Sequence, residues 1–181
     1  MSRLTAIDPK QATGKAKELL DGVQAKIGMT PNLMKGMANS PAALKAYLDF
    51  SGALAGGELD PALREQIALT VGAANQCEYC VSAHTAIGKG AGLSNDELVN
   101  ARNAISGDPK AKAALTFARV VVDAKGNVTN GDLQTLKAAG YSEGEVVEIV
   151  AHVGLNIFTN YFNHVAQTEV DFPKVALAAA R

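Results

Sequence analysis

The stretch REQIALTVGAANQCEYCVSAHTAIGKGAGLS, residues 64–94, decides the fold of this chain of 181 residues. On both sides of the segment AANQ, residues 73–76, apolar residues recur at the spacing of an amphipathic helix. Asn75 and Gln76 are tolerated in a turn better than in the middle of a long helix. The stretch therefore predicts two helices joined by a bend at residues 74–77.

The rest of the chain shows the same alternation of helix-forming runs and stop signals. Pairs of Ser or Asp with Pro mark helix starts, capping boxes occur at two further sites, and glycines fall where helices should end. Few segments alternate apolar and polar residues as a half-buried strand would. These signals predict an all-α fold in one domain over residues 1–181, with helices at about 12–27, 32–38, 41–55, 61–75, 78–90, 94–105, 109–125, 130–139 and 142–167. The tail KVALAAAR after Pro173 is also helix-prone.

Composition excludes several classes of partner. The net charge is −1 and no basic cluster occurs, which speaks against nucleic acid and against acidic membrane surfaces. No apolar run is long enough for a signal peptide or a membrane span, so we expect a cytoplasmic protein. In that compartment, two cysteines at CxxC spacing are more often catalytic or metal-binding than a structural disulfide.

The only two cysteines, Cys77 and Cys80, lie at the predicted start of the second helix, and His84 follows. Residues i, i+3 and i+7 of a helix fall within an arc of about 60°, so these three side chains share one face. A helix N-terminus supplies free N–H groups and partial positive charge, which stabilise a thiolate. Two cysteines three residues apart can also close a disulfide there, because the first turn can adjust.

This arrangement suits peroxide reduction. A thiolate that attacks an O–O bond becomes a sulfenic acid, and a thiol three residues away condenses with it to a disulfide. The reaction also needs groups that move protons, for which His84 and Glu65 are the candidates. In one straight helix Glu65 would lie about 18 Å from Cys77 and about 120° off its face. The mechanism therefore requires the bend at residues 74–77.

Other interpretations stay open at this point. Cys77, Cys80 and His84 could hold zinc with a fourth ligand from His152, His164 or water, which would make the chain a zinc-stabilised interaction module. The pair could also serve general disulfide exchange or redox sensing without peroxidase turnover. For the polar residues of the last helix we favour a polar seam at an interface over direct catalysis; they are His152, Asn156, Asn160, Asn163 and His164.

The pattern E-x11-C-x-x-C-x3-H, from Glu65 to His84, resembles the AhpD-like alkylhydroperoxidases of the carboxymuconolactone decarboxylase superfamily. The segments TPNLMKGMANSP and NIFTNYFNHVA are similar to the peroxidase-related branch of that group. The resemblance implies an AhpD-like helical bundle in which a helical hairpin carries the CxxC at the start of a core helix. It also implies homotrimers or homohexamers and an enzyme that reduces small organic hydroperoxides without a bound cofactor or metal.

Carried over by position, the resemblance makes Cys80 the thiol that attacks the peroxide and Cys77 its proton donor and resolving partner. Glu65 and His84 would run the proton relay, and a lipoyl-bearing or thioredoxin-type donor would reduce the disulfide. This sequence departs from the best-known member, which has histidine where Tyr79 stands here. A tyrosine hydroxyl is a poor base at neutral pH but can donate a hydrogen bond, so Tyr79 is a candidate member of the relay.

Two expectations concern surfaces. The aromatic segment NIFTNYF in the last helix is more apolar than the surface of a lone domain of this size should be, which favours assembly. Scattered apolar side chains should shape the substrate pocket, with Leu69, Phe158 and Phe162 as candidates.

Overall fold

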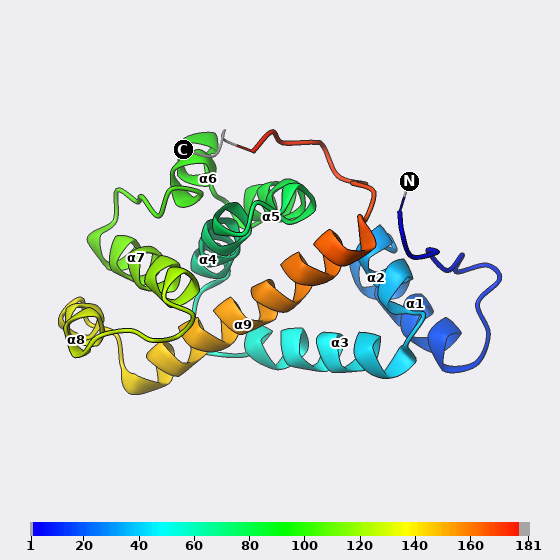
Figure 1. Cartoon of the computed structure of the whole chain (residues 1–181), viewed down its shortest axis with the longest axis horizontal. Helices are drawn as coiled ribbons and strands as arrows, with labels where there is room; N and C mark the ends of the chain where they lie inside the picture. The colour runs from blue at the N-terminus through cyan, green and yellow to red at the C-terminus, as the bar shows by residue number, and fades with distance from the viewer. Residues whose placement is uncertain (1, 178–181) are drawn as a thin grey trace.

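The computed structural model describes residues 2–177, and within that range the chain forms helices and their connections without a strand (Figure 1). The helices of this range are α1 (Gly14–Ile27), α2 (Asn32–Met37), α3 (Pro41–Ala55), α4 (Pro61–Ala74), α5 (Glu78–Gly90), α6 (Asn95–Ala101), α7 (Pro109–Asp123), α8 (Asn130–Ala138) and α9 (Glu143–Ala166). The predicted all-α class is confirmed.

Capping explains why the helix starts could be predicted so closely. α3, α4 and α7 each begin with proline, and the preceding Ser40, Asp60 and Asp108 accept hydrogen bonds from backbone N–H groups of the first turn. Complete capping boxes start α6 at Ser94 and α9 at Ser142.

Two predicted helices differ from the structure. The helix expected over 94–105 ends at Ala101, because Ala104 adopts a left-handed φ of 56° and Ile105 N–H turns back to the carbonyl of Asn100. Glycine is the usual residue for this conformation, so an alanine at this position does not predict the end of a helix. The tail is not helical over residues 174–177, and the rest of that prediction lies outside the described residues.

The core is divided into two clusters. The larger one surrounds α4, which packs against α5, α6, α7 and α9, and it includes Ile67, Leu69 and Val71. The smaller one joins the start of α5 to the N-terminal helices and includes Leu20, Leu33, Leu44, Cys77, Tyr79 and Cys80. The cysteines therefore lie inside a packed region.

α9 crosses the whole bundle (Figure 1). Its buried and exposed faces carry an uncommon distribution of polar and apolar side chains. Its buried face carries His152, Asn156, Thr159, Asn160 and Asn163. Its opposite face exposes a stripe of apolar side chains at helical spacing, Val147, Val150, Phe158, Tyr161 and Val165. The buried side of α9 also carries Ile149, Val153, Leu155 and Ala166, so it mixes polar with apolar side chains while the exposed side carries an apolar stripe.

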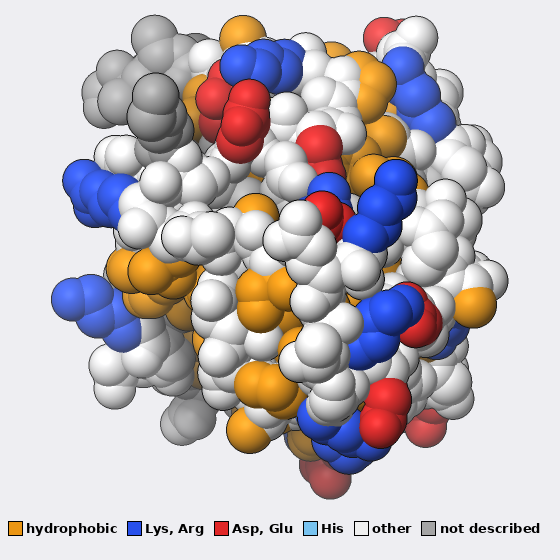
Figure 2. Space-filling view, turned by 90° about the vertical axis from the view of Figure 1, so that its right-hand side faces the viewer, with side chains coloured by type: hydrophobic (Ala, Val, Ile, Leu, Met, Phe, Trp, Pro, Cys, Tyr) orange, Lys and Arg blue, Asp and Glu red, His pale blue; other side chains and the backbone are white. Residues whose placement is uncertain are grey.

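Figure 2 shows the face to the right of Figure 1, where Lys and Arg side chains lie among Asp and Glu with hydrophobic patches between them. The two signs of charge are interspersed, so this face presents no continuous basic field. None of the helices within residues 2–177 has the length and apolar character that crossing a membrane requires.

Candidate functional site

The bend that joins α4 to α5 is where the sequence predicts it. α4 ends at Ala74, Gln76 adopts a left-handed φ of 54°, and Cys77 N–H donates to the carbonyl of Gly72 at 2.9 Å. α5 then runs back along α4. Two close approaches show the antiparallel pairing, since Gly72 faces Cys80 and Gly88 faces Glu65. The bend therefore returns α5 to the level of Glu65.

Cys77 and Cys80 form a disulfide, with their Cα atoms 5.3 Å apart. Cys77 is the N-cap residue of α5, and its sulfur accepts a hydrogen bond from Cys80 N–H at 3.2 Å. The Asn163 side chain on α9 donates from Nδ2 to Cys80 Sγ at 3.3 Å. Both sulfurs are almost fully buried. Each sulfur thus has a hydrogen-bond donor beside it.

Glu65 and His84 form a second pair, with Oε2 of Glu65 2.7 Å from Nδ1 of His84. An ionised carboxylate can only accept, so Nδ1 of His84 carries the hydrogen and Nε2 is left to exchange a proton. Both side chains remain partly accessible. His84 lies one helical turn beyond Cys80, about 6 Å further along α5.

A cavity of about 170 Å³ opens beside this pair. α3, α4, α5 and α9 all contribute to its wall. Its lining residues are Tyr47, Ser51, Ala55, Arg64, Glu65, Ala68, His84, His152, Leu155, Asn156 and Thr159. Burial, with a smaller effect of the Glu65 charge, raises the pKa of Tyr47 to about 12, so its hydroxyl keeps its hydrogen at neutral pH. Burial also lowers the pKa of His152, which favours the neutral imidazole.

The buried face of α9 connects this cavity to the disulfide. His152, Asn156 and Thr159 line the cavity, and Asn163, one turn further along the same face, contacts Cys80. Three polar atoms of this face, Nε2 of His152, Nδ2 of Asn160 and Oδ1 of Asn163, have no hydrogen-bond partner among the described residues. Polar groups buried without partners are rare, so this face is suited to hold a small polar molecule.

The predicted polar seam of α9 does lie at an interface, which is internal to the chain. Asn160 pairs with Asn75 at 2.9 Å, and the His164 ring contacts the carbonyl of Asn75 at 2.8 Å.

Sequence reasoning missed Tyr47 and Arg64 as cavity residues. Arg64 adjoins Glu65, but its guanidinium donates to carbonyls at the end of α3, which no motif indicates.

None of the three apolar residues expected to shape the substrate pocket lines this cavity. Leu69 is fully buried in the larger core cluster. Phe158 lies on the exposed stripe of α9, and Phe162 packs beside Gly36. A helical run shows which residues share a face but not which element covers that face.

Tyr79 lies in the smaller core cluster and does not line the cavity. Its hydroxyl accepts from Leu33 N–H at 3.2 Å, and its ring meets Phe172 edge to face. Burial raises the pKa of Tyr79 far above its usual value, so it keeps its hydrogen. These contacts attach α2 and the C-terminal segment to α5, whereas a part in the proton relay stays a prediction.

Tyr79→Phe separates these two roles. We expect it to lower the free energy of unfolding by about 1–2 kcal/mol, because Leu33 N–H loses its buried partner, and to leave peroxide consumption nearly unchanged. Thermal unfolding and a peroxide assay measure the two effects. Thr116→Val, which removes an exposed hydroxyl from α7, is the control and should change neither. A rate that falls tenfold at unchanged stability would instead place Tyr79 in the relay.

Within residues 2–177, no group of three or more His, Cys, Asp or Glu side chains is arranged to hold a metal ion. His164 contacts a backbone carbonyl and His152 lines the cavity. The two histidines considered as a fourth zinc ligand therefore serve other contacts here.

Comparison with known proteins gives a family and a fold. Residues 41–120 match the model of the carboxymuconolactone decarboxylase family. None of the curated proteins matches the chain. An uncharacterised peroxidase-related protein from Ralstonia eutropha JMP134, described as an alkylhydroperoxidase AhpD core, superposes with a TM-score of 0.83 at 26% identity, over 94% of this chain and 92% of that one.

Two further solved structures share the fold. A peroxidase-related protein from Silicibacter sp. TM1040 has a TM-score of 0.79 at 23% identity, over 92% of each chain. The debrominase Bmp8 has a TM-score of 0.80 at 20% identity, over 93% of this chain and 92% of that one. The family match places residues 41–120 in the carboxymuconolactone decarboxylase family, and the CxxC disulfide and the fold of the Ralstonia protein make the chain similar to the AhpD-like proteins of that family.

Proposed function

We propose that this protein is a thiol-dependent peroxidase that reduces small organic hydroperoxides. One observation carries the proposal: a CxxC disulfide lies on the same helix as His84, which is paired with Glu65 at 2.7 Å. Thiols and a proton-transfer pair are the groups that this chemistry needs. The peroxidase-related proteins of the same fold support the reaction class.

In the first step the thiolate of Cys80 attacks the terminal oxygen of the hydroperoxide. The O–O bond breaks, Cys80 becomes a sulfenic acid, and the alkoxide leaves as the alcohol after taking a proton. His84 Nε2 accepts the thiol proton and returns it to the leaving oxygen, while Glu65 holds the ring and stabilises its charged form. The Asn163 amide, which donates to Cys80 Sγ, favours negative charge on that sulfur.

In the second step Cys77 attacks the sulfenic sulfur, which releases water and forms the disulfide. Cys77 needs no large movement, because the Cα atoms are already 5.3 Å apart. A dithiol of the lipoyl or thioredoxin type then reduces the disulfide by thiol exchange and becomes oxidised itself. The sum converts a hydroperoxide and a dithiol into an alcohol, water and a disulfide.

The cavity beside His84 is the proposed substrate site. At about 170 Å³ it is smaller than the roughly 300–1,000 Å³ of pockets for drug-sized ligands, which favours short hydroperoxides. Its wall offers hydrogen-bonding groups from Tyr47, His152 and Asn156 for the peroxide oxygens.

A thiol titration tests the proposal. Reduced protein should lose both of its free thiols on adding one equivalent of tert-butyl hydroperoxide, and a dithiol should restore them. Steady-state assays then compare hydrogen peroxide, tert-butyl hydroperoxide and a lipid hydroperoxide, with lipoamide and thioredoxin as reductants. We expect the thiols to react at least about 10²-fold faster than a free thiol. Oxidation at the free-thiol rate would contradict the proposal.

The alternative is a disulfide-exchange or redox-sensing protein, which the same cysteine pair would suit. It predicts slow reaction with peroxide and rapid exchange with protein disulfides. The nearly complete burial of both sulfurs favours a small substrate over a protein disulfide.

We also propose that the chain assembles as a homotrimer or homohexamer in the cytoplasm. The exposed stripe of α9 supports assembly, because Val147, Tyr161 and Val165 each expose more than half of their surface. Tyr161→Glu with Val165→Glu should then yield monomers, as measured by light scattering at micromolar concentration. Glu169→Gln, an exposed change beyond α9, is the control. A monomeric wild-type protein would contradict the proposal.

A further inference from the structure

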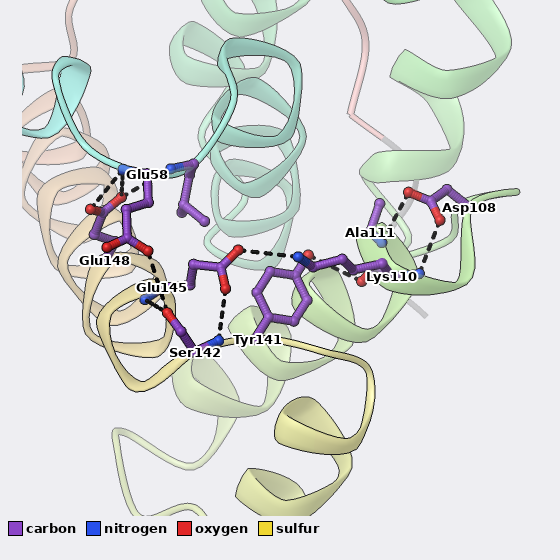
Figure 3. Close-up of polar contacts among 9 residues, drawn as sticks. Glu58, Asp108, Lys110, Ala111, Tyr141, Ser142, Glu145 and Glu148 are labelled. Atoms are coloured by element: carbon purple, nitrogen blue, oxygen red, sulfur yellow. Dashed lines mark hydrogen bonds and ion pairs between the residues drawn. The ribbon is translucent and has the colours of Figure 1, made fainter.

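A second and larger cavity, of about 570 Å³, lies on a different face of α4 from the one that carries Glu65. The first residues of α4, α7 and α9 meet there, together with the region around α6 (Figure 3). Its size falls in the range of small-molecule sites. The proposed peroxidase chemistry uses none of its residues.

The charge of this cavity is negative. Five carboxylates line it against one lysine, Lys110; they are Glu58, Asp60, Glu97, Asp108 and Glu145. Four of them already accept backbone N–H groups at helix starts, from Leu63, Ser94, Lys110, Ala111 and Ser142. The N–H groups that could bind an anion are therefore occupied by the protein's own carboxylates. Capping also lowers the pKa of Glu97 and Glu145, which keeps both charged at neutral pH.

The side chain of Gln66 provides a second observation. Gln66 lines the cavity on the same face of α4 as Ala62 and Leu63, and only 6% of its surface is exposed. Its side chain makes no hydrogen bond to the residues that the structure describes, and its amide remains accessible from the cavity. A primary amide offers both a donor and an acceptor, so a ligand in the cavity can bond to Gln66 in place of water.

The wall of the cavity already shows how it holds a cation. The Lys110 ammonium lies 4.6 Å from the centre of the Tyr141 ring and 3.2 Å from a carboxylate oxygen of Glu145 (Figure 3). A carboxylate and an aromatic face are two groups that attract organic cations.

We propose that this cavity binds a small organic cation, an ammonium or guanidinium group on a short apolar body. The carboxylates of the rim attract the charge, Leu59, Leu63 and Tyr141 contact the apolar body, and Gln66 hydrogen-bonds a polar group that reaches the inner wall. The site is independent of the peroxidase proposal, so either can fail alone.

Three probes that differ mainly in charge test this proposal: phenethylammonium, 2-phenylethanol and 3-phenylpropionate. We expect phenethylammonium to shift the side-chain amide signals of Gln66 in nitrogen-15 NMR spectra. We expect the neutral and anionic probes to bind at least about tenfold more weakly, because the rim is acidic. Gln66→Leu both assigns the signals and should weaken binding of phenethylammonium about fivefold.

If Gln66→Leu does not fold, two other variants still test the proposal. Each of them removes one negative charge, one inside the cavity and one far from it. Glu58→Gln should weaken binding of phenethylammonium about threefold, whereas Glu18→Gln, on the exposed side of α1, should not. The proposal is overturned if phenethylammonium at about 10 mM leaves the Gln66 signals unmoved. It is equally overturned if 2-phenylethanol binds as tightly, or if Gln66→Leu and Glu58→Gln bind like the wild type.

Discussion

Replacing Cys80 with serine is expected to reduce peroxide consumption by at least about 10³-fold, to the rate of the buffer reaction. A serine hydroxyl is far less nucleophilic than a thiolate toward the O–O bond and cannot form a sulfenic acid. The Asn163 amide is closer to the sulfur of Cys80, at 3.3 Å, than to that of Cys77, at 4.0 Å, and Cys80 lies nearer to His84 along α5. Following peroxide loss with excess dithiol measures the effect.

Cys77→Ser is the matched variant, since it removes the partner sulfur from the same turn. It should keep the first reaction with peroxide and lose turnover, because Cys80 sulfenic acid has no resolving thiol. Dimedone should then label Cys80, and mass spectrometry should find one adduct per chain. If Cys77→Ser eliminates the first reaction and Cys80→Ser preserves it, the two cysteines have the opposite roles.

The hairpin and the position of its cysteine pair could be predicted because their signals are local. Asn75 and Gln76 interrupt two helical runs, and the cysteines follow at the start of the second run. Capping residues such as Asp60 and Ser142 determine where helices begin, and their partners lie within three residues. Glu65 could be proposed because the chemistry required a carboxylate. It lies 2.7 Å from His84, whereas a proton relay through this pair stays a prediction.

The rest of the site depends on packing between distant segments. Tyr47 reaches the cavity from α3, and nothing in its local sequence sets it apart from other helical aromatics. Phe158 and Phe162 are four residues apart on α9, yet Phe158 is exposed and Phe162 is packed against α2. The left-handed conformation of Ala104 could not be predicted either, because alanine does not favour it.

The fold alone does not decide the reaction. A debrominase has the same fold at 20% identity, so the scaffold serves more than one chemistry. What favours peroxide here is the combination of side chains. The thiol pair and the Glu65–His84 pair lie on the two helices of one hairpin, and the buried polar face of α9 extends from one pair to the other.

Glu65→Gln is expected to lower kcat/KM for tert-butyl hydroperoxide by about 10²–10⁴-fold. Glutamine preserves the size and can still accept from His84 Nδ1, so the ring should keep its orientation. The variant loses the negative charge that stabilises the protonated ring between taking the thiol proton and giving it to the alkoxide. Thermal unfolding should change little, since the pair is partly accessible.

Glu78→Gln is the control, because Glu78 lies in the first turn of α5 and is exposed. It removes the same charge near the cysteines without touching His84, so only a small change in rate is expected. The double variant Glu65→Gln with His84→Gln should lose no more activity than His84→Gln alone, because residues that act as a unit are not additive. If the losses of activity in the two single variants add up in the double variant, Glu65 acts on the cysteines by a separate route. If Glu65→Gln alone leaves the rate unchanged, the carboxylate has no part in the relay.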